Sequence, residues 1–219
     1  IAGGMPVQKQ TGERWQKITG CPLVVGYGLS ETAPAVSIDP INIKNFSDSI
    51  GLPIPSTEIS IRDNKNKICK QGQVGEICVK GPQVMKGYWK NKEETEKVFS
   101  KDGWFKTGDL GYMESSGFFK IVDRKKDVII VSGFNVYPNE IEEVVMMNAK
   151  IKEAACVASQ NDIGEQVPKL FISLNEGQKI SKEEVITYCR KYLTGYKIPQ
   201  QIEIIDEIPK SNVGKILRR

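Results

Sequence analysis

Chemically useful side chains are concentrated in a few short segments, and the most informative segment surrounds Asp109. This acid closes the triplet Thr107-Gly108-Asp109, where an expected strand runs into a tight turn. A carboxylate there can accept two hydrogen bonds from a vicinal diol, such as the 2′ and 3′ hydroxyls of ribose. A charged run follows at residues 123–127. We interpret the junction as a hinge with a nucleotide site beside it; a turn acid and a solvated charge run are the alternatives.

A second group of functional side chains follows an expected strand at residues 21–25. Tyr27, Ser30 and Glu31 come directly after it, with glycines on both sides of the tyrosine. Glycine-rich turns after strands are common ligand sites in α/β folds. The ring can stack on a flat heterocycle, the hydroxyl can donate to a phosphate oxygen, and the carboxylate can hold Mg²⁺. A helix cap or a turn is the alternative for the Ser-Glu pair.

Lys215 follows a flexible polar loop near the end of the sequence. Such a lysine can reach a site made by another domain and act on phosphates as a point charge. The Gly214-Lys215 pair is not a phosphate-binding P-loop, because Ile216 stands where Ser or Thr is required. A solvated surface position is the alternative for this lysine.

The composition excludes several classes of protein. The sequence has no histidine, which excludes Ser-His-Asp and Cys-His catalysis within these residues. Its five cysteines are dispersed, so we expect neither a structural zinc site nor a disulfide framework, and a reducing compartment follows. A net charge of +4 is too balanced to indicate nucleic-acid binding. No apolar run approaches the length of a membrane span.

The elements that must position these side chains differ on the two sides of the charged run. Before it, short strands such as residues 57–61 and 74–80 predict a β-barrel-like or distorted sheet. After it, alternating helices and strands predict a small α+β domain. The expected fold class is therefore mixed α+β, with domains at residues 1–123 and 124–219.

Caps and apolar periodicity outline the expected helices. Asn91 and Asn139 are candidate N-caps, and Ser181 and Glu184 have the spacing of a capping box. The helix after that box has an apolar stripe, which we expect in the core: Val185, Ile186, Cys189, Tyr192 and Leu193. Later strands are expected at residues 128–131, 154–158, 170–174 and 201–205.

Seven segments occur in an order and spacing that is informative as a set. They are Gly3-Gly4, YGLSET, GEICVKGPQVMKGYW, WFKTGD, VDRKKDVIIVSGFNVYPNEIEE, LTGYKIP and PKSNVGKILRR. Over nearly its whole length the sequence resembles the adenylate-forming (AMP-binding) enzymes, which include acyl-CoA synthetases, luciferases and peptide-synthetase adenylation domains. GPQVMKGYW, VDRKKD, VSGFNVYPNEIE and PKSNVGKILRR resemble bacterial long-chain-fatty-acid–CoA ligases in particular.

The resemblance implies a nucleotide site and a role for each of its members. The residues that would contact the nucleotide are Gly3, Gly4, Tyr27, Gly28, Ser30, Asp109 and Arg124. Tyr27 would stack on adenine in a pocket lined by the glycines, and Ser30 would contact the α-phosphate. Asp109 would bind the ribose hydroxyls, with Arg124 close by, and Glu31 would hold Mg²⁺.

Three further roles are implied after the charged run. Lys126 would sit at the hinge between domains, Gly133 would lie where the pantetheine arm of CoA passes, and Lys215 would be the catalytic lysine of the first step. The implied reaction activates a fatty acid with ATP to an acyl-adenylate, and CoA then displaces AMP. We expect a cytoplasmic protein, with peripheral association with the inner membrane as a further hypothesis.

One feature of the family is missing from the sequence. The Ser/Thr/Gly-rich loop for the β- and γ-phosphates is not found, and the family's acyl pocket lies mostly upstream. We therefore expect the C-terminal part of a longer enzyme that is inactive alone and does not reveal the acyl chain length. The alternatives are an adenylation domain that acylates a carrier protein and a non-catalytic nucleotide-binding module. The ligase-like segments weigh against the first, and Lys215 with Glu31 and Asp109 against the second.

Overall fold

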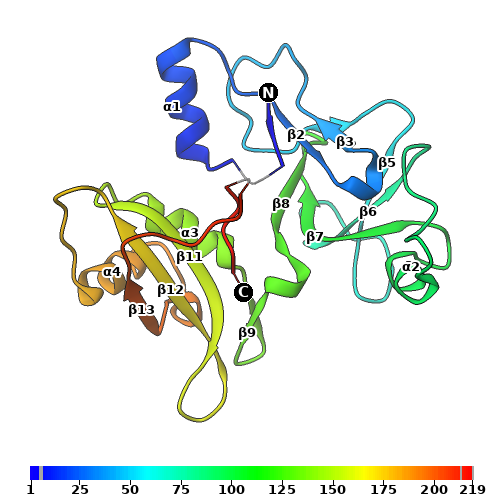
Figure 1. Ribbon diagram of the computed structural model, residues 1–219. Coiled ribbons are helices and arrows are strands. Elements are labelled where there is room, and N and C mark those ends of the chain that lie inside the picture. Colours follow the sequence, from blue (N-terminus) through cyan, green and yellow to red (C-terminus); the bar gives the residue numbers. More distant parts are fainter. Residues whose placement is uncertain (5–6, 213, 219) are drawn as a thin grey trace. The chain divides into compact units, whose positions relative to one another are not determined.

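A computed structural model describes residues 1–4, 7–212 and 214–218 of the chain (Figure 1). The chain folds into two compact units, Ile1–Lys125 and Lys126–Arg219. Both units combine helices with small β-sheets, so the predicted mixed α+β class is confirmed. None of the helices in the described ranges has the length and apolarity that crossing a membrane requires.

The first unit contains two four-stranded sheets. The first sheet has β1 parallel to β2 and otherwise antiparallel neighbours, in the order β1 (Ala2–Gly3), β2 (Val25–Gly28), β3 (Ala35–Ile38) and β4 (Leu52–Pro53). The second is antiparallel throughout, in the order β5 (Glu58–Arg62), β6 (Gly75–Lys80), β7 (Phe105–Met113) and β8 (Phe119–Arg124). The helical segments are α1 (Lys9–Thr19), the 3₁₀ turn η1 (Ser30–Thr32) and α2 (Lys92–Val98). Buried side chains from both sheets form one core, which includes Val36, Ile61, Ile77, Val79 and Phe119.

The second sheet is open, so the prediction of a β-barrel-like arrangement is wrong. Its outer strands are β5 and β8. The free edge of β8 is occupied by a loop: Ile50 N–H donates to the Phe119 carbonyl at 2.8 Å, and Phe119 N–H donates to the Gly51 carbonyl at 3.1 Å. Because β5 and β8 do not pair with each other, the four strands remain an open sheet.

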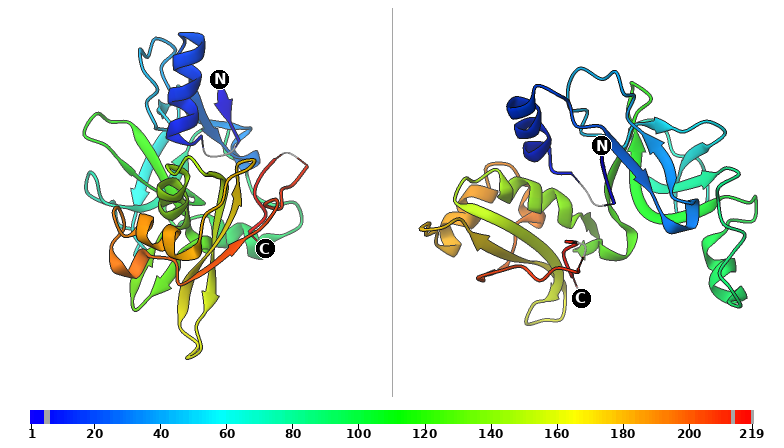
Figure 2. Two further views of the ribbon diagram at one scale, coloured as in Figure 1. Left: turned by 90° about the vertical axis from the view of Figure 1, so that its left-hand side faces the viewer. Right: turned by 45° about the horizontal axis from the view of Figure 1, so that its top comes forward.

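The second unit packs two helices against a three-stranded sheet (Figure 2). The sheet order is β11-β12-β13, with β11 antiparallel and β13 parallel to β12. In chain order the elements are the 3₁₀ turn η2 (Lys125–Asp127), β9 (Ile129–Val131), β10 (Phe134–Val136), α3 (Pro138–Met146), β11 (Ile151–Gln160), β12 (Gln166–Leu174), α4 (Lys182–Cys189), the 3₁₀ turn η3 (Gly195–Lys197) and β13 (Gln201–Ile204).

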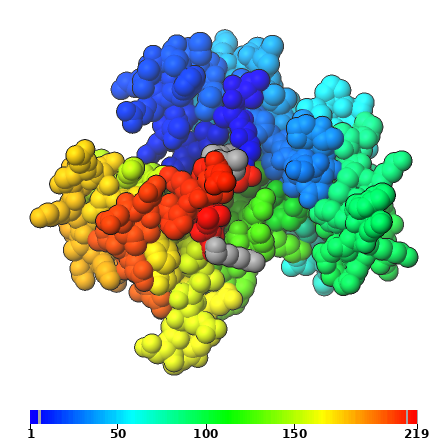
Figure 3. Space-filling view, in the orientation of Figure 1, coloured from blue at the N-terminus to red at the C-terminus, as the bar shows by residue number. Residues whose placement is uncertain are grey.

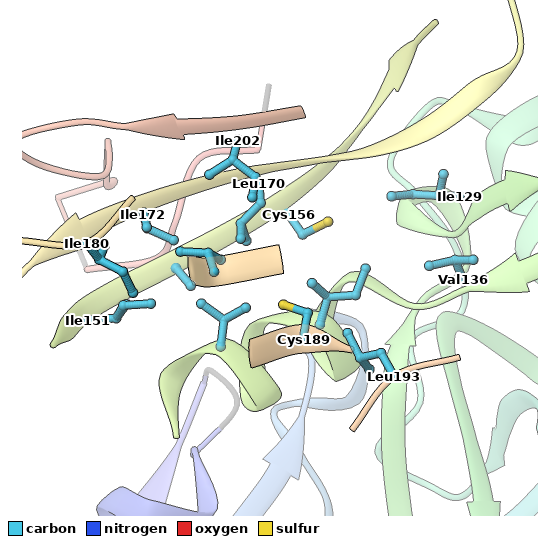
Figure 4. Packing of buried hydrophobic residues seen from close by; sticks show 14 of the residues in the cluster. Ile129, Val136, Ile151, Cys156, Leu170, Ile172, Ile180, Cys189, Leu193 and Ile202 are labelled. Carbon is cyan, nitrogen blue, oxygen red and sulfur yellow. The ribbon is translucent and has the colours of Figure 1, made fainter. Parts of the chain in front are cut away.

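Apolar side chains of the sheet and the helices point toward one another in this unit (Figure 4). The sheet contributes Cys156, Leu170, Ile172 and Ile202, all buried. Val145 of α3 and Cys189 of α4 are fully buried against them. Removing one such aliphatic side chain from water stabilises a fold by about 1.5–3 kcal/mol. The unit therefore has a hydrophobic core of its own.

Three local predictions differ from the structure. The strand expected at residues 21–25 begins only at Val25, because the chain leaves α1 through an exposed turn. Asn139 is not the N-cap of α3, because Pro138 takes the first helical position. Tyr192 is 57% exposed rather than in the core: it lies beyond the end of α4 at Cys189, where only Leu193 of the predicted stripe is buried.

Candidate functional site

Three polar side chains of the first unit form a directly bonded cluster. Tyr27 lies on β2, Asp109 on β7 and Arg124 at the end of β8. The Tyr27 hydroxyl donates to Asp109 Oδ2 at 2.6 Å, and Arg124 Nε lies 3.3 Å from Oδ1. The Asp109 side chain is only 7% exposed. Both carboxylate oxygens are thus oriented, and each keeps a lone pair with which to accept a bond from a diol.

The backbone around Asp109 explains its fixed position. Asp109 lies inside β7, paired with Arg124 on β8, and not in the expected turn. Gly108 has a φ of +76°, which glycine adopts at little cost, and the register of β7 with β6 shifts nearby. The Asp109 N–H donates to Thr107 Oγ1 at 3.1 Å, and the Thr107 hydroxyl donates to the Ile77 carbonyl at 2.8 Å. A bulged strand therefore presents this carboxylate.

The protonation of the cluster follows from burial. Burial raises the pKa of the Asp109 carboxyl, although the Tyr27 hydroxyl and the Arg124 guanidinium act to lower it. The negative charge of Glu76 raises it further. Burial, followed by the charge of Asp109, raises the pKa of the Tyr27 phenol, which therefore keeps its proton. The direction of the bond is fixed as a result: the tyrosine donates and the carboxylate accepts.

Glycines allow close backbone approach beside Tyr27. Gly3 on β1 is the register partner of Gly26 on β2. A Cβ at Gly3 would lie 2.8 Å from the Gly26 carbonyl oxygen, and a Cβ at Gly28 would lie 1.7 Å from the carbonyl oxygen of a facing residue. Gly4 follows β1 with a φ of +82°. Because β1 and β2 are parallel, these glycines gather at the edge where Tyr27 lies.

Ser30 and Glu31 form the turn η1 directly after β2. The Thr32 hydroxyl fixes this turn by accepting from the Leu29 N–H at 3.0 Å. Ser30 is exposed, and Glu31 Oε1 accepts from the Tyr88 hydroxyl at 3.0 Å. Within the described ranges, no three His, Cys, Asp or Glu side chains cluster as a metal site. A single carboxylate still fits Mg²⁺, which keeps waters and substrate phosphates as its other ligands.

The other predicted residues lie on three elements of the second unit. Lys126 is exposed in η2. Gly133 and Ser132, with φ of +83° and +49°, form the two-residue turn between β9 and β10. Lys215 is exposed in the tail after β13. The described part of this tail, in red, lies on the molecular surface in Figure 3. The structure thus brings the predicted residues of the first unit together. The residues predicted for the hinge, the CoA path and catalysis, which are Lys126, Gly133 and Lys215, lie in the second unit.

Two side chains beside the site were not predicted from the sequence. Glu76 Oε1 accepts from the Gly108 N–H at 3.2 Å, while its Oε2 lies 2.9 Å from Lys125 Nζ. Tyr88 holds Glu31, as described above. Both lie in the GEICVKGPQVMKGYW segment, but their partners are 32 and 57 positions away. No local sequence signal could therefore have paired them.

Two family matches cover most of the chain. Residues 1–89 match the AMP-binding enzyme family, and residues 140–215 match the AMP-binding enzyme C-terminal domain. The chain therefore belongs to the AMP-binding, adenylate-forming enzymes, as the sequence predicts.

Within that superfamily the chain is similar to acyl-CoA ligases. It is 52% identical over 219 residues to the long-chain-fatty-acid–CoA ligase of Yersinia pestis, covering all of this chain and 39% of that one. It is 47% identical over 219 residues to the Haemophilus influenzae ligase, again with 39% of the relative covered. The chain thus spans about two fifths of these relatives and corresponds to their C-terminal part.

Solved structures of the superfamily have the same fold. ATP-bound MatB from Rhodopseudomonas palustris matches with a TM-score of 0.93 at 30% identity, covering 98% of this chain and 42% of that one. MenE from Bacillus subtilis, in complex with ATP and magnesium ion, matches with a TM-score of 0.86 at 33% identity, covering 99% of this chain and 44% of that one. The mixed α+β architecture is therefore that of the C-terminal part of adenylate-forming enzymes.

Proposed function

We propose that this chain is the C-terminal part of a long-chain-fatty-acid–CoA ligase. Residues 1–123 form the last section of the large AMP-binding domain, and residues 124–219 form the small mobile domain, with the hinge at Lys126. The observation that carries the proposal is the buried Asp109 carboxylate, held by Tyr27 and Arg124, in a chain similar over its whole length to such ligases.

The nucleotide binds through the cluster of the first unit. Asp109 accepts hydrogen bonds from the two ribose hydroxyls, since Tyr27 and Arg124 already orient its oxygens. The Tyr27 ring stacks on adenine in a pocket lined by Gly3, Gly4 and Gly28, of which Gly4 has open space where a side chain would stand. Its bond to Asp109 couples base and ribose recognition.

The first reaction joins the fatty carboxylate to the α-phosphate of ATP. A carboxylate oxygen forms the new bond to phosphorus, and the bond to pyrophosphate breaks. Lys215 and Ser30 stabilise the negative charge that builds up at the α-phosphate. Glu31 would hold Mg²⁺, which would supply further stabilisation of phosphate charge.

In the second reaction the CoA thiolate attacks the acyl carbon and AMP leaves. Gly133 leaves space for the pantetheine arm, because it carries no side chain at the tip of its hairpin. Neither nucleophile requires a histidine base, since one is an ionised carboxylate and the other a thiolate. Peripheral contact with a membrane stays a prediction.

A chimera tests this function. The part of the Yersinia pestis ligase that precedes the matched segment is joined to this chain, and palmitate-dependent ATP–pyrophosphate exchange and palmitoyl-CoA formation are measured with Mg²⁺. We expect both activities in the chimera and neither in the 219-residue chain alone. Lys215→Ala should abolish the exchange, whereas Lys179→Ala, at an exposed loop position, should leave it unchanged.

Two outcomes would contradict the proposal. Exchange by the chain alone would mean that its own residues hold all three phosphates. A folded chimera that acylates a carrier protein in preference to CoA would show that the chain belongs to an adenylation domain and not to a CoA ligase.

A further inference from the structure

The predicted catalytic lysine lies in a small hairpin of its own. Lys210 and Ile216 pair as an antiparallel bridge after β13. Ser211 N–H donates to the Lys215 carbonyl at 2.8 Å, and Leu217 N–H donates to the Pro209 carbonyl at 2.9 Å. A hairpin this short is not stable by itself. Something outside it must hold Lys215 in place.

One end of the hairpin is fixed to the sheet of the second unit. Ile208, just before the hairpin, is 2% exposed. Lys210 forms an ion pair and hydrogen bond with Glu153 on β11. These contacts hold the first strand of the hairpin, but they lie on the far side of the turn from Lys215.

The other end is held by Arg218, for which the sequence suggested no role of its own. Its Nη2 donates to Asn139 Oδ1 at 2.7 Å and to both carboxylate oxygens of Glu142 at 2.8 Å. Its Nη1 lies 3.8 Å from Asp127 Oδ2. The side chains of Arg218, Glu142 and Asp127 are 19%, 8% and 14% exposed. The guanidinium is therefore enclosed by groups from α3 and η2.

The partners of Arg218 are themselves fixed. Glu142 lies on α3, and its Oε1 also accepts from the Cys156 N–H on β11 at 2.8 Å. Asp127 ends η2, directly after Lys126. Along the tail the exposure alternates: Ile216 and Arg218 are half-buried, while Lys215 and Leu217 are exposed. The arginine thus faces the unit and the lysine faces away from it.

We propose that Arg218 is a positioning residue for Lys215: by binding Glu142, Asn139 and Asp127 together, it fixes the lysine-bearing hairpin to α3 and to the hinge turn. The inference rests on the proposed function, since it assumes that Lys215 acts in the first reaction. The tail then moves with its unit as one body, and the lysine arrives at the phosphates without a separate ordering step. A planar guanidinium can bind these partners at once, because its N–H donors point in several fixed directions. A lysine ammonium lacks this rigid arrangement of donors.

The contacts of Arg218 with Asn139, Glu142 and Asp127 form a clamp on the hairpin. Hydrogen exchange on the 219-residue chain tests this clamp without an activity assay. Arg218→Ala should speed exchange in peptides that cover residues 209–217 and leave β11 and β12 unchanged. Arg218→Lys should give an intermediate effect. The control Arg190→Ala removes an exposed arginine of the same unit and should change nothing. Unchanged exchange in the tail of Arg218→Ala would overturn the proposal.

The chimera then separates positioning from general loss of structure. Because misplacement of a catalytic group by about 1 Å can cost about 100-fold, Arg218→Ala should lower pyrophosphate exchange by about that factor. Thioester formation from preformed palmitoyl-adenylate and CoA should be retained, since Lys215 is not needed there. Equal loss of both half-reactions would overturn the positioning role. A parent chimera without exchange would instead refute the proposed function, while the hydrogen-exchange result still decides the clamp.

Discussion

Asp109 combines two requirements that conflict within one residue. For the proposed binding of ribose its carboxylate must be ionised, yet it is almost fully removed from water. Tyr27 and Arg124 compensate only in part, because burial still raises its pKa. The buried charge of Asp109 therefore lowers the free energy of unfolding, as is common for residues that serve binding.

Asp109→Asn should therefore stabilise the fold near neutral pH. Since burial raises the folded pKa of Asp109 above its unfolded pKa, the native carboxyl holds its proton, between these two pKa values, more strongly than the unfolded chain does. The parent's free energy of unfolding then falls as pH rises from about 3.9 through the folded pKa. The asparagine of the variant does not titrate. The gain in the free energy of unfolding of Asp109→Asn over the parent should therefore grow as pH rises through this window, and it should vanish below the window. Urea unfolding at a series of pH values measures this.

The control is Asp162→Asn, an exposed acid in the loop between β11 and β12, which should show no such trend. In the chimera, losing charged bonds to ribose should weaken nucleotide binding by about 10- to 100-fold for Asp109→Asn. A stability difference that does not change with pH would show that the pKa of Asp109 is not raised.

At the scale of elements, the predictions that succeeded depend on local sequence. The box at Ser181 and Glu184 is formed in both directions, with bonds of 3.1 and 2.7 Å, and Asn91 caps α2 as expected. Asn139 is not the cap because Pro138 takes the first helical position, and its amide oxygen instead accepts from Arg218, 79 positions away. The Tyr27–Asp109 bond spans 82 positions, so only the family resemblance, and no spacing rule, could place both residues in one site.

Helix α1 is an element that no local sequence pattern predicts. Its residues Lys9–Thr19 are mostly polar, with only Trp15 and Ile18 as large apolar side chains, both exposed. No apolar stripe marks it in the sequence, so its helix was not predicted.

The capping box of α4 gives a prediction at this scale. Ser181→Ala should lower the free energy of unfolding by about 1 kcal/mol, because the Glu184 N–H loses its acceptor. Lys182→Ala, at the next, exposed position, is the matched control and should be neutral. Chemical denaturation compares them; equal stability of the two variants would mean that the box contributes nothing.

At the scale of the molecule, the second unit has the core of an independent domain. Residues 126–219 expressed alone should fold and unfold cooperatively, because the sheet and both helices bury a continuous apolar cluster. Thermal unfolding followed by circular dichroism measures this. Ile172→Asn, at a fully buried position of β12, should abolish the transition. A parent segment without a cooperative transition would show that the fold depends on the first unit.

The junction between the units gives the last prediction, on the proposed reorientation about Lys126. Proline fixes φ near −65° and disfavours helical geometry at the residue before it, here Lys125 of η2. Lys126→Pro should therefore restrict the junction to one backbone geometry. If two orientations serve the two half-reactions, one geometry cannot serve both. Pyrophosphate exchange and thioester formation from preformed adenylate should then fall by unequal factors in the chimera. Lys101→Pro, in the turn closed by Ser100 and Gly103, controls for proline itself. Equal loss of both half-reactions would mean that the junction only connects the units.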